Sequence, residues 1–309
     1  MHIHRHWTGL PPAARGASVT MGNFDGVHRG HRSLIDHARA AAPDAPLGII
    51  TFEPHPRQFF APDAPPFRLM DAGARAHRLE RLGVDHLYEL PFDTVLSGMS
   101  AEDFIRKVLA EGLGIRHLTI GEDFRFGRGR SGDAAMLAAM APGLGFGLSA
   151  MPLIGEAGTR FSSTAARQAL SDGDPDEAAR ILGHRHRIEG PVIHGEKRGR
   201  DMGFPTANMA LDGLHLPRLG IYAVLVDILT GPHAGESHRG AASIGVRPTF
   251  GHAAPNLETY LLDFEGDLYG ETLSVALVAF LRPEQAFDSV DALIAQMQRD
   301  TARTREVLG

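Results

Sequence analysis

Residues 22–31 read Gly22-Asn23-Phe24-Asp25-Gly26-Val27-His28-Arg29-Gly30-His31, a glycine-rich stretch with two histidines three positions apart. Residues 17–21 before it are typical of a short strand, and residues 33–40 after it have helical composition. The stretch is therefore predicted to turn a strand into a helix, where free backbone N–H groups and the helix dipole attract an anion. His28 and His31 would lie on one face of the first helical turn and reach the same phosphate. The alternative is a pair of exposed or metal-binding histidines, in a chain that contains 17 of them.

The first half of the chain alternates apolar runs with helical patterns, which predicts βαβ units and a parallel sheet. Strands are expected at residues 18–21, 47–52, 86–90, 117–120 and 148–151. A helix is expected at residues 100–109, which open with a serine and carry an acidic residue three positions later. Ligands of such sheets bind beyond the carboxyl ends of the strands. Residues 22–31, 53–55 and 121–126 each follow an expected strand, so they are predicted to converge on one crevice.

Beyond about residue 183, β-rich segments follow one another between Gly/Pro turns, at residues 221–226, 241–245 and 257–264. This pattern predicts an antiparallel barrel or sandwich. From residue 287 to residue 308 apolar residues recur at near-helical spacing, with Asp288 as the candidate N-cap. We expect one amphipathic helix packed on the barrel, with a partner-binding helix as the alternative. The predicted domains are residues 1–182 and 183–309.

The composition is that of a globular protein, with 309 residues, 43% hydrophobic and 22% charged. The absence of cysteine excludes a disulfide framework, a thiolate nucleophile and a Cys-ligated metal site. The first residues lack the apolar stretch of a signal peptide, and no run approaches the ~18 apolar residues of a membrane span. A cytoplasmic protein without a membrane partner is therefore expected.

The net charge of -6 provides no global attraction for nucleic acid, so no nucleic-acid partner is expected. Any polyanionic ligand must be held by local groups. Residues 125–130 contain three arginines, and residues 197–200 contain three cations, in both cases interleaved with glycine. This arrangement suits a close approach of the backbone to phosphates. A solvated basic surface is the alternative.

Further motifs follow in order: FEPHP at 52–56, GEDFRFG at 121–127, FSST at 161–164, GFPTAN at 203–208 and LETYLLDF at 257–264. Together with residues 22–31, they make almost the whole chain resemble the bacterial bifunctional riboflavin kinase/FMN adenylyltransferases, also called FAD synthetases. The resemblance implies an α/β Rossmann-like nucleotidylyltransferase domain. An antiparallel β-barrel riboflavin kinase domain with a C-terminal helix is implied to follow it.

The resemblance assigns the transfer of AMP from ATP to FMN to the first domain, with FAD and pyrophosphate as products. In-line attack on the α-phosphorus builds charge on its equatorial oxygens, which positioned donors stabilise. His28 and His31 are the candidates for that role. The resemblance also implies nucleotide-binding residues, namely Gly22, Asn23, Phe24, Gly30, Ser162, Ser163, Thr164 and Arg167. For the serines and the threonine, a simple N-cap of the helix at 165–170 is the alternative, although a capped helix start is also an anion site.

Three residues of the first domain are candidates for flavin binding: Phe60, Asp123 and Phe126. Phe60 precedes a Pro/Ala-rich surface loop at residues 61–66, which could flank a flat ligand. Asp123 stands where the family has Asn or Asp near the flavin and the phosphates. Phe126 would stack on the isoalloxazine ring, and a buried core phenylalanine is the alternative.

For the second domain the resemblance implies phosphorylation of riboflavin. Thr206 and Asn208 are two apart, hence on one side of an extended strand, and both offer oxygen ligands. By resemblance they hold Mg²⁺ on the ATP phosphates, and a turn stabilised by side-chain hydrogen bonds is the alternative. Glu258 is the candidate general base, with a salt-bridging glutamate as the alternative. The nucleotide lid is implied to contain Gly195, Lys197, Gly199 and Gly203.

The leading hypothesis is a bifunctional enzyme that converts riboflavin and ATP to FMN, and then FMN and ATP to FAD. Its cofactors would be ATP and Mg²⁺, and its partners the small molecules riboflavin, FMN and ATP. One alternative is a flavin-binding or regulatory protein that has lost its activities. Another is a nucleotidylyltransferase acting on a different phosphate substrate.

Overall fold

The computed structural model describes residues 1–152, 154–156, 159–195, 199, 202–249 and 252–309. The chain divides into two compact units, and each has its own six-stranded sheet. Unit 1 comprises Met1–Pro65 and Arg75–Phe161, and unit 2 comprises Pro66–Ala74 and Ser162–Gly309. The predicted domain boundary at 182/183 stays a prediction. Across the described residues, no helix is long and apolar enough to cross a membrane.

Unit 1 is built on a parallel sheet with strand order β1-β4-β3-β2-β5-β6, which confirms the predicted α/β fold. Its strands are β1 (His2–His4), β2 (Ser18–Met21), β3 (Leu47–Glu53), β4 (His86–Pro91), β5 (His117–Gly121) and β6 (Gly147–Met151). The five predicted strands agree to within one residue at each end. The sixth, β1, was not predicted, because three residues at a sheet edge leave no readable alternation.

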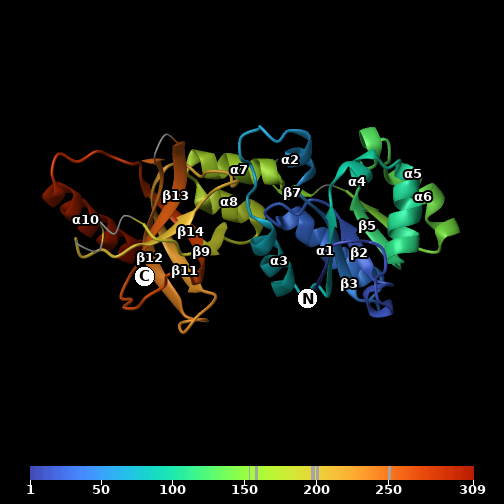
Figure 1. Ribbon diagram of the computed structural model, residues 1–309, viewed down its shortest axis with the longest axis horizontal. Coiled ribbons are helices and arrows are strands. Elements are labelled where there is room, and N and C mark those ends of the chain that lie inside the picture. The colour runs from blue at the N-terminus through green and yellow to red at the C-terminus, as the bar shows by residue number, and fades with distance from the viewer. Residues whose placement is uncertain (153, 157–158, 196–198, 200–201, 250–251) are drawn as a thin grey trace. The chain divides into compact units, whose positions relative to one another are not determined.

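Helices cover both faces of this sheet (Figure 1). Val19 and Met21 of β2 pack into the core with Phe104, while Ser18 faces α1 (Arg29–Ala41) and donates to Ala38 O at 2.6 Å. The other α-helices that lie wholly in this unit are α2 (Pro56–Phe60), α4 (Thr94–Gly98), α5 (Ala101–Asp103) and α6 (Ala134–Met140). A short hairpin pairs β7 (Gly155–Glu156) with β8 (Thr159–Arg160).

The helix predicted at residues 100–109 differs from the one observed. Ser100 is the N-cap, as its sequence indicates, and its Oγ accepts from Asp103 N–H at 3.1 Å. After the three residues of α5, however, the chain continues as a π-helix over Phe104–Leu113. Six residues of this π-helix are buried, so core packing outweighs the α-helical preference there.

Unit 2 is a nearly closed antiparallel barrel with strand order β10-β13-β12-β11-β14-β9, and a bridge between Ile193 and Asn208 links its two edges. The strands are β9 (Arg187–Pro191), β10 (Ala207–Ala210), β11 (Gly220–Ile228), β12 (Ser237–Thr249), β13 (His252–Leu261) and β14 (Thr272–Arg282). This confirms the predicted barrel. The helices α7 (Ser163–Asp172) and α8 (Pro175–Leu182) belong to the same unit, and α3 (Ala72–Arg81) begins in it.

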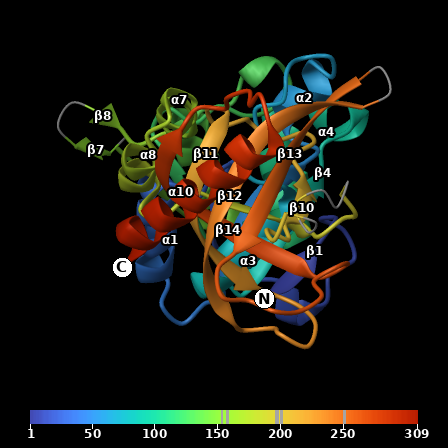
Figure 2. The same ribbon diagram turned by 90° about the vertical axis from the view of Figure 1, so that its left-hand side faces the viewer.

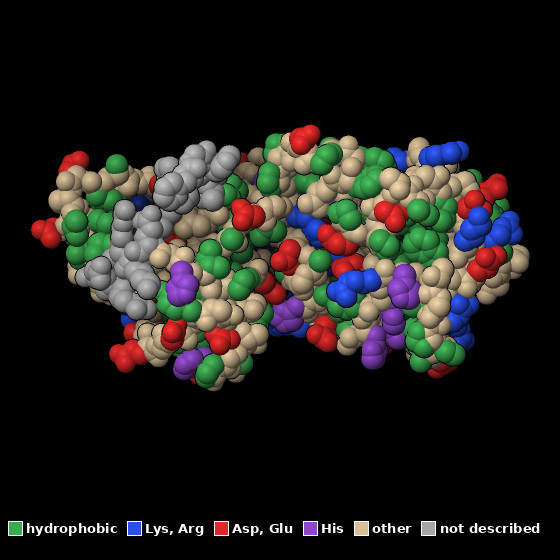
Figure 3. All heavy atoms as spheres, in the orientation of Figure 1, with side chains coloured by type: hydrophobic (Ala, Val, Ile, Leu, Met, Phe, Trp, Pro, Cys, Tyr) green, Lys and Arg blue, Asp and Glu red, His purple; other side chains and the backbone are tan. Residues whose placement is uncertain are grey.

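The closing helix α10 (Val290–Leu308) lies across the barrel strands, as Figure 2 shows. The prediction of Asp288 as its N-cap is wrong by one residue. Ser289 has the extended conformation of a cap, and its Oγ accepts from Ala292 N–H at 3.2 Å. Cationic and anionic side chains are interspersed on the visible face of the molecule (Figure 3), in keeping with the absence of a global basic field.

Candidate functional sites

The loop after β2 has an unusual backbone. Gly26 has a positive φ of 79°, but Phe24 and Val27 also have positive φ values of 52° and 42°. Such conformations are costly for side chains other than glycine, and they persist only where packing fixes them. Phe24 and Val27 are both fully buried, and their burial anchors the loop. Strain that is held in this way beside a helix start is typical of a functional site.

His28 is the N-cap of α1, and it does not lie inside the first helical turn as the sequence predicted. Its Nδ1 accepts from the backbone N–H of His31 at 3.3 Å. Because Nδ1 is the acceptor, the neutral ring carries its proton on Nε2. The capping bond therefore fixes the tautomer of His28 and leaves Nε2–H as its donor.

His31 stacks directly on His28, with ring centroids 3.7 Å apart, and its other neighbour is Phe24 at 4.7 Å. Burial, with a smaller contribution from His28, lowers the pKa of His31 well below its usual value, so the ring is neutral at pH 7. Within the described residues its Nδ1 is buried without a hydrogen-bond partner. A neutral ring with a buried, unused nitrogen is a feature that ligand binding would explain.

Gly30 leaves the space that this stack needs. A Cβ at this position would lie 2.9 Å from His28 Nδ1 and 3.2 Å from Phe161 O. Gly22 and Asn23 precede the strained residues, and their backbone ties the loop to β3. Gly22 N–H donates to Ile50 O at 3.1 Å, and Asn23 O accepts from Thr51 Oγ1 at 3.3 Å.

The candidate flavin residues of unit 1 differ in exposure. Phe60 is 68% exposed and packs edge-on against Phe59 and Phe92. Phe126 is buried in the core against Phe104, which favours the structural alternative for that ring. The carboxylate of Asp123 is exposed and pairs with Arg160 Nη2 at 2.7 Å.

The candidate nucleotide-binding residues Ser162, Ser163, Thr164 and Arg167 belong to unit 2. Ser162 caps α7, since its Oγ accepts from Ala165 N–H at 3.2 Å, so the N-cap interpretation is confirmed. Arg167 Nη1 donates to Phe67 O at 3.3 Å, and its Nη2 donates to Thr164 Oγ1 at 3.4 Å. Ser163 is the first residue of α7. The helix start therefore combines a dipole, a hydroxyl and a guanidinium, which is a suitable arrangement for an anion.

The barrel aligns polar residues from neighbouring strands. Glu258 lies opposite Asn208 of β10 and opposite Ser243 of β12, so all three point to one face. The flanking residues Leu257 and Thr259 are fully buried on the other face. Asn256 Nδ2 donates to Glu258 Oε1 at 3.1 Å and helps to orient the carboxylate.

Thr206 and Asn208 stand at the start of β10. Asn208 Nδ2 donates to Thr206 O at 3.2 Å, which leaves the side-chain Oδ1 as a ligand atom. A Cβ on Gly195 would lie 2.6 Å from the Asn208 amide, so the glycine permits this close approach. Gly199 and Gly203 are the other described lid residues, whereas Lys197 lies outside the described residues.

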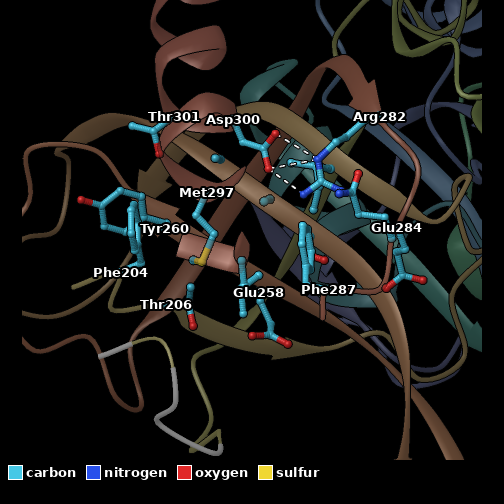
Figure 4. Close-up of a pocket in the computed structure, with 16 residues that line it drawn as sticks. Phe204, Thr206, Glu258, Tyr260, Arg282, Glu284, Phe287, Met297, Asp300 and Thr301 are labelled. Atoms are coloured by element: carbon cyan, nitrogen blue, oxygen red, sulfur yellow. Dashed lines mark hydrogen bonds and ion pairs between the residues drawn. The ribbon is translucent and has the colours of Figure 1, made fainter. Parts of the chain in front are cut away.

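Two pockets adjoin Thr206. The first, of about 220 Å³, lies on the outer face of the barrel and includes Glu258, Tyr260 and residues of α10 (Figure 4). The second, of about 370 Å³, has apolar walls from Leu261, Phe264 and Leu268, together with Tyr269. Thr206 lines both pockets, so a group held at Thr206 is accessible from either one.

The contribution of α10 to the first pocket was missed from the sequence. Met297 was predicted to pack on the barrel, yet it lines the pocket together with Asp300, Thr301 and Arg282. Helical periodicity identifies the face of a helix but not whether that face meets side chains or a cavity. The sequence feature that could have indicated this role was Asp300, a charged residue on the apolar face of the helix.

A candidate anion site with a histidine pair lies at a strand-to-helix turn, and a barrel with oxygen-bearing side chains between two pockets follows it in the chain. This combination is typical of a nucleotide-dependent transferase. The FAD synthetase family matches residues 10–165, and the riboflavin kinase family matches residues 182–308. The bifunctional riboflavin kinase/FMN adenylyltransferase of Pseudomonas fluorescens is 42% identical over 308 residues, with 99% of this chain and 97% of that protein covered. The protein of the same name from Escherichia coli K12 is 41% identical, with coverage of 95% and 93%. The chain therefore belongs to the bifunctional riboflavin kinase/FMN adenylyltransferase family.

A solved structure with a similar fold comes from Streptococcus pneumoniae and is described as a macrolide-efflux protein. It aligns with a TM-score of 0.83 at 31% identity, and the alignment covers 98% of each chain. The same two-unit architecture therefore occurs in both chains.

Proposed function

We propose that this chain phosphorylates riboflavin to FMN in unit 2 and adenylylates FMN to FAD with the histidine pair of unit 1. The observation that carries the first step is the position of Thr206 on both barrel pockets, with Glu258 lining one of them. A kinase needs a nucleotide and an acceptor on two sides of the transferred phosphoryl group. The family membership supports both reactions.

For phosphorylation, riboflavin occupies the pocket lined by Glu258, and the nucleotide occupies the pocket lined by Phe264. Glu258 accepts the proton of the ribityl 5′-hydroxyl while that oxygen attacks the γ-phosphorus, and ADP leaves. The hydrogen bond from Asn256 holds the carboxylate in place, and the apolar wall of the second pocket suits a purine ring.

Magnesium fits the residues present at the start of β10. Thr206 Oγ1 and Asn208 Oδ1 are neutral oxygen donors, and Mg²⁺ prefers oxygen ligands and takes most of them from phosphates and water. The orientation of the Asn208 amide leaves Oδ1 available. When bound, the ion would neutralise charge on the phosphate oxygens, and Thr206 and Asn208 would hold it.

For adenylyl transfer, His28 donates from Nε2–H to an oxygen of the α-phosphate, and the neutral His31 ring beside it supplies the second donor. The N-terminus of α1 adds its dipole to the same charge. FMN attacks the α-phosphorus through a phosphate oxygen, and pyrophosphate leaves. Ser162, Ser163, Thr164 and Arg167 are the proposed groups for the remaining phosphates, and Phe60 and Asp123 are proposed for the flavin. We further propose that the chain works in the cytoplasm.

The test is to incubate the purified chain with riboflavin and Mg-ATP and to resolve FMN from FAD by chromatography. Wild type should make both products. Glu258→Gln should make no FMN from riboflavin but should still make FAD when FMN is supplied. His28→Ala should make FMN but little FAD. If wild type makes neither product, the proposed function is wrong. If either variant loses both steps while folded, the assignment of one reaction to each unit is wrong.

A further inference from the structure

Helix α10 is held to the barrel in an unusual way. Its apolar residues Leu293, Ile294 and Met297 are only half-buried, and Leu293 and Met297 line the first pocket. Among the residues of α10, all of which are described, Asp300 and Thr304 are the buried ones. Where the helix covers the pocket, a charged side chain therefore provides the most buried contact.

Asp300 forms a nearly dry ion pair with Arg282, the last residue of β14. Its carboxylate accepts from Arg282 Nη2 at 2.7 Å and from Nε at 3.0 and 3.1 Å, and Gln296 Nε2 donates to it at 2.8 Å. The side chains of Arg282 and Asp300 are only 17% and 10% exposed. A two-pronged guanidinium–carboxylate pair of this kind fixes direction as well as distance, so it sets the angle of the helix.

The same guanidinium also holds the segment 283–289, which connects β14 to α10. Arg282 Nη1 donates to Pro283 O at 3.0 Å, and its Cζ lies 5.9 Å from the centroid of the Phe287 ring. The side chain of Glu284 lies against Gly245 of β12, where a Cβ would be 2.6 Å from Glu284 Oε1. The segment is otherwise largely exposed, so its position depends on these contacts.

Figure 4 shows the result around the pocket, where the Arg282–Asp300 pair lies at one side and Met297, Phe287 and Glu284 project near it. Arg282 is also in register with Ile221, which is in register with Ser243, the cross-strand neighbour of Glu258. One row of strand residues thus links the base candidate to the ion pair. Both partners are satisfied by each other, so neither is free to carry out chemistry.

We propose that Arg282 and Asp300 are positioning residues that hold α10 and segment 283–289 over the flavin pocket, so that riboflavin affinity depends on their ion pair. This inference rests on the proposed riboflavin kinase function of the same pocket. The pair acts through the pocket wall and touches neither Thr206 nor Glu258 in the described contacts. Its loss is therefore expected to weaken riboflavin binding and to leave the phosphoryl-transfer step nearly intact.

The primary variant is Asp300→Asn in the full chain, which keeps the side-chain size but removes the charge. The expected result is a rise of about tenfold or more in the KM for riboflavin, with kcat changed less than about threefold. Adenylyl transfer to supplied FMN should be unchanged, which would show that the effect is confined to the kinase reaction. A fluorescence titration of riboflavin should show the same loss of affinity.

The matched control is Arg305→Gln. Arg305 also ties α10 to the barrel, through two 2.7 Å bonds to Asp263, but it does not line the flavin pocket. Its KM for riboflavin should remain within about twofold of wild type because an exposed pair contributes little. An equal rise in KM for both variants would mean that general loosening of the helix is responsible, and the proposal would be wrong.

A second variant, Arg282→Lys, keeps the positive charge but loses the two-pronged geometry of the guanidinium. It tests the role of the ion pair if Asp300→Asn folds poorly. It should raise the KM for riboflavin as well, and the double variant should be no worse than the more severe single one, because the two residues act as a pair. A wild-type KM in both single variants, or additive effects in the double one, would overturn the proposal. If wild type makes no FMN at all, the proposed function fails first, so the two failures are distinguishable.

Discussion

His28 combines two roles that a pair of substitutions can separate. Its Nδ1 caps α1 through the His31 N–H, and its Nε2–H is the proposed phosphate donor. His28→Asn removes the ring but retains a side-chain oxygen that can cap the helix, whereas His28→Ala removes both. Asparagine is among the preferred N-cap residues, and alanine is among the poor ones.

The expected magnitudes follow from these two roles. Loss of the cap costs about 0.5–2 kcal/mol, so His28→Ala should be less stable than His28→Asn by that amount. Loss of one positioned donor at a charged transition state costs about 2.7–4 kcal/mol, or a factor of about 10²–10³ in kcat. Both variants should therefore lose adenylyl transfer equally, although only the alanine variant loses the cap.

The assay supplies FMN and Mg-ATP and follows FAD by chromatography, with FMN formation from riboflavin as the control in the same preparation. Chemical denaturation followed by circular dichroism compares the stability of the two variants. If His28→Asn makes FAD within a factor of about three of the wild-type rate, the imidazole supplies less than ~0.7 kcal/mol and the donor role is refuted. If the two variants are equally stable, His28 does not act as a cap.

Two further predictions concern unit 2. Gly195→Ala places a Cβ 2.6 Å from the Asn208 amide, so FMN formation should fall by about 10²-fold while adenylyl transfer is unchanged. Gly190→Ala, which meets only the flexible end of Met209 at 3.5 Å, is the matched control and should be active; full kinase activity in both variants would contradict the role of Asn208. Burial, more than nearby histidines, lowers the pKa of His186 from 6.5 to about 3, so the unfolded chain takes up this proton first as the pH falls. The contribution of His186 to the free energy of unfolding is therefore complete above about pH 6.5 and is lost as the pH falls toward 3. His186→Leu should flatten that part of a curve of unfolding free energy against pH. An unchanged slope would show that another group is responsible.

The sequence could predict the central strands of the parallel sheet because those strands are buried and most of their side chains are apolar. Strands β3 and β4 read as short apolar runs between turn residues, and their observed bounds follow those runs. The π-helix after Asp103 could not be predicted in this way. Its residues have the composition of an α-helix, and the change in hydrogen bonding depends on how the core packs around them.

The histidine site shows a similar limit. The spacing of His28 and His31 predicts an anion site, which stays a prediction, and it also placed both residues in the helix. The structure places His28 before the helix because the strained backbone at Phe24 and Val27 delays the helix start. That strain depends on the burial of both side chains, a tertiary effect that a local motif does not encode. The shift matters for the chemistry, because only as a cap does His28 have a fixed tautomer.

The barrel site depends on strand register, which a single sequence does not specify. Asn208, Ser243 and Glu258 lie on three different strands, and a shift of one residue in β13 would turn Glu258 into the barrel interior. The buried Leu257 and Thr259 on either side prevent that shift, since it would expose Leu257 to the pocket. The hydrophobic pattern that closes the barrel therefore also places the base candidate outside it. Arg282 is in register with Glu258 through β11 and β12, so the residues that shape the proposed flavin pocket are fixed by the same register as the residues proposed for its chemistry.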